Sequence, residues 1–563
     1  MRDRDLPLAL LPGVVAFLLV VGLRPLIPTN IAWLTEPDPA MQYMGWAFYR
    51  HEPWTAVGLS TPIGTNAGYG LELGSSILYA DAVPLLAMLL RPLSSWLPEP
   101  FQYFGLWLLS CFLLQSFFAW KLLGLASDDR ASGRERGIVQ LMGAGLFVFA
   151  PPLLFRLNMG HYALVGHWTI LAALLLNLRP PRRPVLAWSA LIFATALIHT
   201  YLLAIVCFLW GSSWVSRSMV GKRNRMVAAG EIVGIACLAV GALWEAGFFL
   251  VSSGRDLPGF GVYHMNFLAP INPAGWSRVL PAWPGHDGDY EGFNFLGLGG
   301  LASLVLAVPG AVWLLARGRL PVRRDWIPLG ATLLVLFVYA LSNTIGFGSS
   351  AFTYSLPEAA TRVLSTLRAS GRLFWPVFYV LLVASLAVVT RAVGARVASV
   401  LVAGLVVVQI VDMTPGWWPL REKLNVPPER RWQSPLVAPF WSDAASAYST
   451  LRRYPPRMRP GWEIWADYAQ RHGMRTDAVY LARLDADRRA ALDERESAQL
   501  LAGRFDSRTL YILDEGMWSQ LASIIDPRAD FLTKIDGFFV LAPEWNARRR
   551  LSSIDFQPSA VSR

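Results

Sequence analysis

Apolar stretches separated by arginine-rich loops recur along most of the chain, and they limit the fold more than any other feature. A helix that spans a bilayer needs about 20 mostly apolar residues. Only 16% of the 563 residues are charged and 54% are hydrophobic, whereas soluble proteins carry about 25% charged residues. The apolar stretches are 6–27, 101–126, 137–155, 162–178, 185–198, 201–215, 226–251, 293–316, 326–341, 373–390 and 397–413. The sequence therefore predicts a polytopic α-helical membrane protein with about 11 transmembrane helices.

Basic residues gather in five of the short loops, and they predict the orientation. Loops on the cytoplasmic side carry an excess of Arg and Lys. The basic loops are 130–136, 179–183, 217–225, 317–324 and 391–396. If all five are cytoplasmic, the N-terminus is cytoplasmic too, and 185–216 must form a hairpin of two short spans that breaks near His199. The same rule accounts for the net charge of +11, so no nucleic-acid partner is needed.

One apolar segment, 75–97, does not fit this alternation. It is long enough to span, but it contains Asp81 and Arg91, is broken by Pro84, and would reverse the side of the basic loops that follow. We expect it to lie as an amphipathic helix in the outer interface. The long loops 28–74, 252–292 and 342–372 are then external, and their Trp, Tyr and Gly content argues against disorder.

The composition changes after residue 413, where the spans stop and charged residues become frequent. Prolines 415, 419, 427 and 428 indicate a linker. Beyond it, the pattern predicts helices at 439–454, 462–471, 488–501 and 518–525, and strands at 479–484, 510–513 and 537–541. The expected organisation is a membrane domain over 1–413 and a small external α/β domain over 414–563.

Two carboxylates follow the first span, in the stretch Thr35-Glu36-Pro37-Asp38-Pro39. Asp38 could simply be the N-cap of a helix that begins at Pro39. A second interpretation is that this stretch holds a carboxylate base, Asp38 or Glu36, close to the outer membrane face.

Basic and aromatic residues from distant segments are expected at the same face. Each histidine alone could be a packed, hydrogen-bonded residue, and no pair has the HxxxH spacing of a metal site, so no metal ligands are predicted. Ionisable groups at membrane depth are costly and usually functional, and phosphate is the natural ligand of Arg and His. The predicted phosphate-binding residues are Arg156, His161, His167, His199, Tyr201, Arg368 and Arg372. For Arg368 and Arg372, contact with lipid headgroups is the alternative.

Five segments carry a resemblance to known proteins: EPDPAMQYMGWAFYR, YGLELGSSILYADAVPL, RLNMGHYALVGHW, LIHTYL and RASGRLFWP. Together with about eleven spans and an external C-terminal domain, they resemble a bacterial family of GT-C-like membrane proteins within the GT-C superfamily of integral-membrane glycosyltransferases. The resemblance implies a GT-C-like architecture in the bacterial inner membrane, with the C-terminal domain in the periplasm.

The same resemblance implies an activity. GT-C enzymes transfer a sugar from a polyprenyl-phosphate donor to a periplasmic acceptor, and Asp38 matches their first-loop acidic base, with Glu36 a poorer match. Some members bind a divalent cation, Mg²⁺ or Mn²⁺, through paired acids, whereas this chain has Glu-Pro-Asp, so a cation is left open. The partners expected are the lipid-linked donor, membrane lipids and an acceptor that is a glycan, lipid or protein. The alternatives are a flippase or transporter of lipid-linked saccharide, and a ligase that moves a whole oligosaccharide.

Overall fold

The computed structural model describes residues 5–54, 61–126, 133–220, 224–251, 258–319, 323–456 and 460–548. These residues form two compact units, each made of three chain segments. The first unit comprises Met1–Trp33, Gln102–Ala242 and Asp256–Pro428, and the second comprises Leu34–Phe101, Leu243–Arg255 and Glu429–Arg563. Three basic residues of the predicted cytoplasmic loops, Arg130, Lys222 and Arg223, lie outside the described residues.

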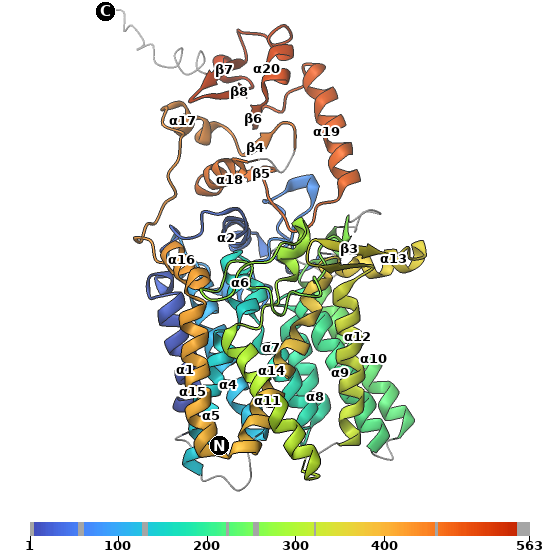
Figure 1. The fold of residues 1–563 in the computed structure, drawn as a ribbon. Helices are drawn as coiled ribbons and strands as arrows, with labels where there is room; N and C mark the ends of the chain where they lie inside the picture. Colours follow the sequence, from blue (N-terminus) through green and yellow to red (C-terminus); the bar gives the residue numbers. More distant parts are fainter. Residues whose placement is uncertain are drawn as a thin grey trace, which may run out of the picture. The chain divides into compact units, whose positions relative to one another are not determined.

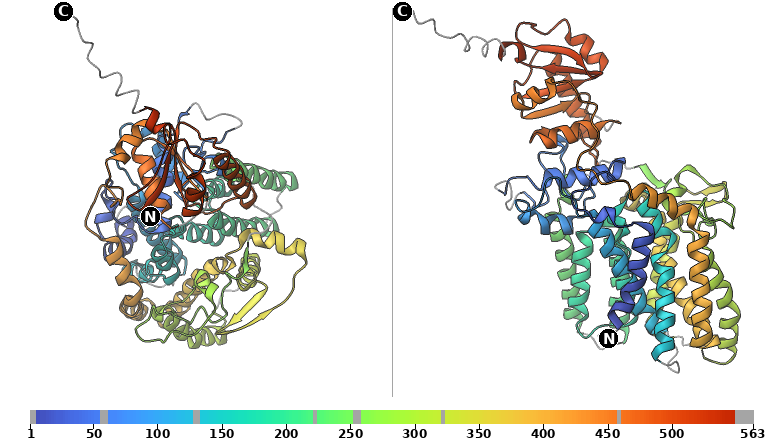
Figure 2. Two further views of the ribbon diagram at one scale, coloured as in Figure 1. Left: turned by 90° about the horizontal axis from the view of Figure 1, so that it is seen from above. Right: turned by 90° about the vertical axis from the view of Figure 1, so that its left-hand side faces the viewer.

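Eight helices in the described part of the chain are long and apolar enough to cross a membrane, so the chain has the character of a multi-pass membrane protein. They are Phe104–Leu125, Gly133–Asn158, Thr200–Met219, Arg225–Glu245, Leu298–Ala316, Arg324–Leu341, Ser370–Val393 and Ala395–Asp412. The long helices of the first unit stand side by side, as Figures 1 and 2 show.

Three further predicted spans are shorter apolar helices: α1 (Asp5–Val20), α7 (Trp168–Leu178) and α8 (Pro184–Ala196). The predicted break near His199 is confirmed, because α8 ends at Ala196 and α9 (Thr200–Val220) begins four residues later. Another break separates α5 (Gly133–Val148) from α6 (Pro151–Asn158). Two prolines, Pro151 and Pro152, start α6, and neither can donate a hydrogen bond back to α5.

Close contact between helices depends on small and polar side chains, as is usual in membranes. A Cβ atom on Gly13 of α1 would stand 2.4 Å from the carbonyl oxygen of Phe112 in α4 (Phe104–Ala126). Ser116 of α4 donates a hydrogen bond to the Ala9 carbonyl at 2.7 Å. Because Gly13 lacks a side chain, the two helix backbones can approach this closely.

A buried glutamine links two other helices. Gln409 lies in α15 (Ala395–Asp412), and its Oε1 accepts hydrogen bonds from the backbone N–H groups of Gly299 (2.9 Å) and Gly300 (3.3 Å). Both glycines lie in the first turn of α11 (Leu298–Ala316), where N–H groups have no partner within the helix. Gln409 is therefore a side-chain cap supplied by a neighbouring helix.

The described connections of the first unit contain several short elements. They contain β1 (Pro258–Gly261), a 3₁₀ helix (Asp287–Gly292), the antiparallel pair β2 (Thr344–Phe347) and β3 (Ser350–Thr353), and α13 (Glu358–Leu364). A further 3₁₀ helix, Ser370–Phe374, leads into α14 (Trp375–Val393), and α12 is Ile327–Leu341.

The prediction of a linker from residue 414 is wrong for its first part. Residues Thr414–Leu424 form α16, with a proline in its first turn and Pro419 inside it. Proline is well tolerated in the first turn of a helix. Lys423 near its end donates to the Asn158 carbonyl of α6 at 3.1 Å, so α16 packs within the first unit.

The second unit contains α2 (Pro37–Tyr49), a 3₁₀ helix (Leu71–Leu73) and α3 (Pro84–Leu90). The helix predicted over 75–97 is thus wrong at its start, because residues before Pro84 form turns. Arg91 is also not at a surface: it is buried, and it donates to the carbonyl groups of Ile63 and Glu52, both at 3.0 Å. These buried hydrogen bonds, rather than an interface with lipid, explain the arginine.

The C-terminal residues form the small α/β domain that the sequence predicts. Its five-stranded sheet has the order β5-β4-β6-β8-β7, with β4 parallel to β5 and β6, and β8 antiparallel to β6 and β7. The strands are β4 (Thr450–Arg453), β5 (Arg475–Thr476), β6 (Thr509–Leu513), β7 (Phe531–Ile535) and β8 (Phe538–Ala542); the helices are α17 (Phe440–Ala447), α18 (Trp462–Arg471), α19 (Ala486–Leu501) and α20 (Glu515–Leu521). Figure 1 shows α20 beside β8.

Two predictions within this domain are wrong. The helix expected over 439–454 ends at Ala447, and β4 follows it. Residues 479–484 are not a strand, although they include the buried Val479 and Leu481. The backbone there pairs with another segment of the same unit: Ala482 N–H donates to the Tyr79 carbonyl at 2.8 Å, so it is not available to the sheet.

Candidate functional site

A buried carboxylate, Glu291, lies between two arginines in the first unit. Arg156 at the end of α6 donates from Nη1 to Glu291 Oε2 at 2.6 Å and from Nη2 to the Glu291 carbonyl at 2.8 Å. Arg372 donates from Nε to Oε2 at 3.0 Å and from Nη2 to Oε1 at 2.9 Å. We call Arg156, Glu291 and Arg372 the ion cluster; it joins three segments that are far apart in the sequence.

The side chains of the ion cluster are almost completely buried. Arg156 is fully buried, and Glu291 and Arg372 are each 8% exposed. Burial alone would raise the pKa of Glu291, but the guanidinium groups of Arg372 and Arg156 outweigh it and hold that pKa well below its usual range. Glu291 is therefore ionised at neutral pH, and the three residues together carry one net positive charge.

Two glycines allow the cluster to form. Gly371 precedes Arg372, and Gly292 follows Glu291; a Cβ atom on Gly371 would stand 2.5 Å from the Cα of Gly292. Asn294 holds the contact by donating from Nδ2 to the carbonyl groups of Gly292 and Gly371, both at 2.9 Å. The two backbones touch because neither residue has a side chain, and the adjacent charged side chains are thereby brought together.

Aromatic rings surround the arginines. The Arg372 guanidinium lies 4.6 Å from the centre of the Tyr201 ring, and that of Arg156 lies 5.8 Å from the Trp375 ring. Such contacts favour cations where water is excluded. The Tyr201 hydroxyl also accepts a hydrogen bond from the Ala369 N–H at 2.8 Å, and His199 Nδ1 accepts from the Tyr201 N–H at 3.1 Å.

His161 and His167 have different surroundings. Arg156 Nη1 donates to Nδ1 of the half-buried His161 at 3.3 Å, so His161 borders the ion cluster. His167 is fully buried, and its Nδ1 shares a hydrogen bond with the Tyr379 hydroxyl at 2.8 Å. That hydroxyl also accepts from Gln115 Nε2. The geometry of His167 fits a packing role better than phosphate contact.

Arg368 differs from the other arginines of this region. Its side chain is half-buried, and among the described residues it has no hydrogen-bond or ion-pair partner. The backbone around it is fixed, since Ala369 is bonded to Tyr201, and Gly371 N–H donates to the Tyr263 carbonyl at 3.2 Å. An unpaired guanidinium on a fixed backbone is suited to binding an anion.

The two predicted carboxylates, Glu36 and Asp38, belong to the second unit. Asp38 is not the N-cap of its helix: Glu36 holds that position, Pro37 begins α2, and Asp38 lies in its first turn. Glu36 is exposed, whereas Asp38 is half-buried.

Glu291 lies in the loop 252–292 and is not among the predicted site residues. The only sequence signal for this residue is indirect: arginines predicted to be buried need an acidic partner, but the sequence does not say which one. A further group, His264, His286 and Asp289, also escaped prediction, since only the spacing of His286 and Asp289 is visible in the sequence. This is the group within the described residues whose geometry could hold a metal ion.

Two protein-family models match the chain. A model described as a domain of unknown function, DUF6311, matches residues 9–414, well over half of the chain. The chain belongs to the DUF6311 family. A second model, described as the DUF6311 C-terminal domain, matches residues 440–543. No curated protein matches the chain.

The longer DUF6311 match includes every candidate residue. It covers the ion cluster and Arg368 of the first unit as well as Glu36 and Asp38 of the second. The C-terminal DUF6311 match spans the five-stranded sheet, from before β4 to the end of β8.

Proposed function

We propose that this DUF6311 protein is a membrane glycosyltransferase that moves a sugar from a polyprenyl-phosphate donor to an acceptor on the periplasmic face of the bacterial inner membrane. The observation that carries the proposal is Arg368, a half-buried cation without a protein partner among the described residues, four positions before Arg372 of the ion cluster. The finer features we propose with it are eleven spans, a GT-C-like architecture and a cytoplasmic N-terminus.

The phosphate of the donor is assigned to Arg368 first. The donors of Arg156 that face Glu291 and the Tyr290 carbonyl are already used, so we assign Arg156 to holding Glu291 and Arg372 in place. Arg372, His161, Tyr201 and His199 line the same region through the contacts described above, and they complete the phosphate-binding set. His167 supports the set through Trp375, with ring centres 4.2 Å apart.

The reaction we propose is a single displacement. Asp38 accepts the proton of the acceptor hydroxyl, and the acceptor oxygen forms a bond to the anomeric carbon. The bond between that carbon and the phosphate oxygen breaks, and polyprenyl phosphate leaves with the electron pair, stabilised by Arg368. No oxidation state changes in this displacement, so it needs no redox cofactor. Glu36 is the exposed neighbour and the less suited base.

The experiment compares lipid-linked sugars and glycans in cells that carry the wild-type protein or a variant. We expect Asp38→Asn to lower transfer by about 10²–10⁴-fold, the usual contribution of a general base, and Arg368→Gln to lower it by at least tenfold. In both cases, the polyprenyl-linked sugar should accumulate.

The matched controls are Glu36→Gln and Arg362→Gln. Arg362 is highly exposed and pairs with Glu358 at 2.8 Å, so its loss should leave transfer within about twofold of wild type. Normal transfer by Arg368→Gln would remove the phosphate assignment, and normal transfer by Asp38→Asn would remove the base. Donor that accumulates only on the cytoplasmic side would instead favour a flippase.

A further inference from the structure

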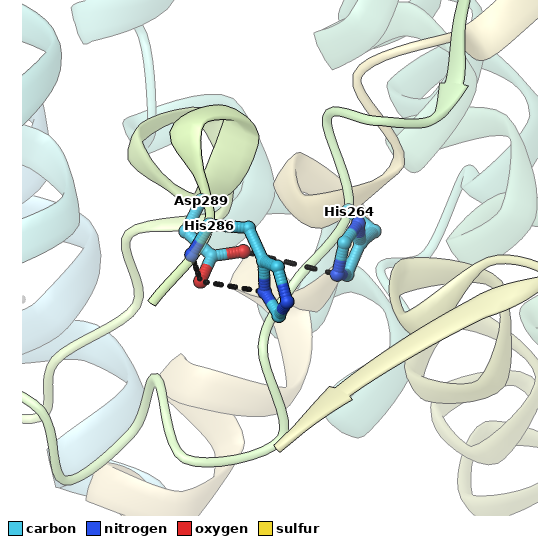
Figure 3. A group of neighbouring side chains, drawn as sticks. All are labelled: His264, His286 and Asp289. Carbon is cyan, nitrogen blue, oxygen red and sulfur yellow. Dashed lines mark hydrogen bonds and ion pairs between the residues drawn. The ribbon is translucent and has the colours of Figure 1, made fainter. Parts of the chain in front are cut away.

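Three potential metal ligands face one another in the loops of the first unit. Figure 3 shows His264, His286 and Asp289, whose ligand atoms all lie within 4.8 Å of one another. His264 Nε2 is 3.7 Å from Asp289 Oδ1, and His286 Nδ1 is 3.8 Å from Asp289 Oδ2. His264 Nε2 and Asp289 Oδ1 are buried atoms with no hydrogen-bond partner among the described residues, and the His286 side chain accepts from the Asp289 N–H as the cap of the 3₁₀ helix. Buried polar atoms are rarely left unsatisfied, so two that face each other need an explanation.

The neighbours orient these atoms in the way that metal sites require. His264 donates from Nδ1 to the Gly261 carbonyl at 3.1 Å, which leaves the lone pair on Nε2. Asp289 Oδ2 accepts from Asn266 Nδ2 at 2.9 Å and from the His286 N–H at 3.0 Å, which leaves Oδ1. Hydrogen bonds from the second atom of a ligating group typically fix the ligand in metal sites.

A glycine keeps space open beside the three atoms. A Cβ atom on Gly346 of β2 would stand 2.8 Å from His264 Nε2 and 3.1 Å from Asn266 Nδ2. Gly346 pairs with Ala351 in a regular antiparallel ladder, and its φ is not positive. Its backbone therefore does not require glycine, whereas the space next to His264 Nε2 does.

We propose that His264, His286 and Asp289 bind a divalent transition-metal ion, with Zn²⁺ as the best match. Two imidazoles and one carboxylate suit zinc, and imidazole nitrogen disfavours Mg²⁺. Tetrahedral zinc holds its ligand atoms roughly 3.3–3.6 Å apart, so the 3.7 Å between His264 and Asp289 needs little movement. A tetrahedral ion held by these three residues would take one more ligand, such as water.

The ion would stabilise the loop that carries Glu291. Asp289 is two residues before Glu291. A Cβ atom on Gly292, which follows Glu291, would stand 2.2 Å from the His264 carbonyl oxygen. Two of the three ligands, Asp289 and His264, are therefore adjacent to the ion cluster. This inference is independent of the proposed sugar transfer, because the ion takes no part in the displacement.

The test measures metal in the full-length protein, purified in detergent through a tag without histidine. After exposure to Zn²⁺ and removal of the excess, we expect about one zinc per wild-type chain and at least tenfold less in His286→Gln and Asp289→Asn. His286 is one-third exposed, so its variant should fold. His51→Gln, an exposed histidine of the second unit, is the matched control and should keep its zinc.

A second measurement separates loss of metal from loss of fold. Co²⁺ in a four-coordinate site gives strong visible absorption bands, which should appear in the wild type and not in His286→Gln. In thermal unfolding, EDTA should lower the Tm of the wild type and leave the Tm of His286→Gln unchanged. A wild-type protein that takes up neither Zn²⁺ nor Co²⁺, or a His286→Gln protein that keeps its zinc, would overturn the proposal.

Discussion

Glu291 is held by two arginines in an environment with little water, and this makes the stability of the chain sensitive to the state of one carboxylate. A buried charge loses its hydration, and only close partners compensate for that loss. Arg156 and Arg372 donate four hydrogen bonds to Glu291, one of them to its backbone carbonyl. Removal of the carboxylate would leave two buried cations facing each other.

Glu291→Gln should therefore lower the free energy of unfolding by about 3–5 kcal/mol at pH 7, the usual cost of leaving buried charges unpaired. The measurement is reversible unfolding in mixed micelles. Glu358→Gln, which removes a highly exposed partner of Arg362, is the control and should change stability by less than about 1 kcal/mol.

The effect should also depend on pH. The pKa of Glu291 is lower in the folded chain than in the unfolded chain, so its contribution is complete above the ordinary glutamate value of about 4.3 and is lost as the pH falls below it. The stability difference between wild type and Glu291→Gln should shrink by up to roughly 1.4 kcal/mol per pH unit below that value. A difference that stays constant from pH 7 to pH 3 would contradict the ionised state.

At this scale, the sequence indicates which residues are unusual but not which partner each one has. Arg156 and Arg372 were predicted as site residues because they are charged and close to apolar segments. Glu291 and Arg372 are 81 positions apart, and the contact between Gly292 and Gly371 that joins them is a tertiary feature. Pattern and spacing report local structure, so they could not distinguish the paired Arg372 from the unpaired Arg368.

Helices were predicted more accurately than strands. The α18 helix agrees with its predicted bounds, and the break between α8 and α9 was found, because helical periodicity and hydrophobic length are local signals. The strands β4, β5 and β7 were missed. Strand β5 has two residues, and β7 is only half-buried over most of its length, so neither has the alternating pattern of a typical strand.

The cap that Gln409 supplies to α11 gives a prediction about elements. Gln409→Leu would leave the N–H groups of Gly299 and Gly300 without their side-chain acceptor, at a cost of about 1–3 kcal/mol for a buried group. Unfolding in mixed micelles should show this loss. Val407→Leu, at an exposed position of the same helix, is the control; equal stabilities of the two variants would contradict the capping role.

For the whole molecule, the sequence indicates the membrane character through its composition and predicts the C-terminal sheet through its helix and strand pattern. It could not predict that Leu34–Phe101 and Leu243–Arg255 join Glu429–Arg563 in one compact unit. The grouping depends on contacts between distant segments, such as the salt bridge of 2.6 Å between Arg452 and Glu72. Apolar length and charge carry no information about such pairs.

The proposed topology can be tested with single cysteines in a background that lacks Cys111, Cys207 and Cys237. A reagent that cannot cross membranes should label Val279→Cys and Val437→Cys in intact spheroplasts, because both positions are exposed and lie in the proposed periplasmic parts. Arg182→Cys and Arg319→Cys should react only after the membrane is opened. Labelling of Val279→Cys only after opening would make the eleven-span proposal wrong.

The single net charge of the ion cluster has a consequence for the proposed reaction. A sugar linked to polyprenyl phosphate is a phosphodiester with one negative charge, whereas the departing monoester approaches two. Glu291 neutralises one of the two positive charges of Arg156 and Arg372, so the ion cluster and Arg368 together carry two positive charges. These two positive charges would match the charge of the leaving group better than that of the intact donor. An enzyme that stabilises the charge distribution of the transition state more than that of the bound substrate increases the reaction rate.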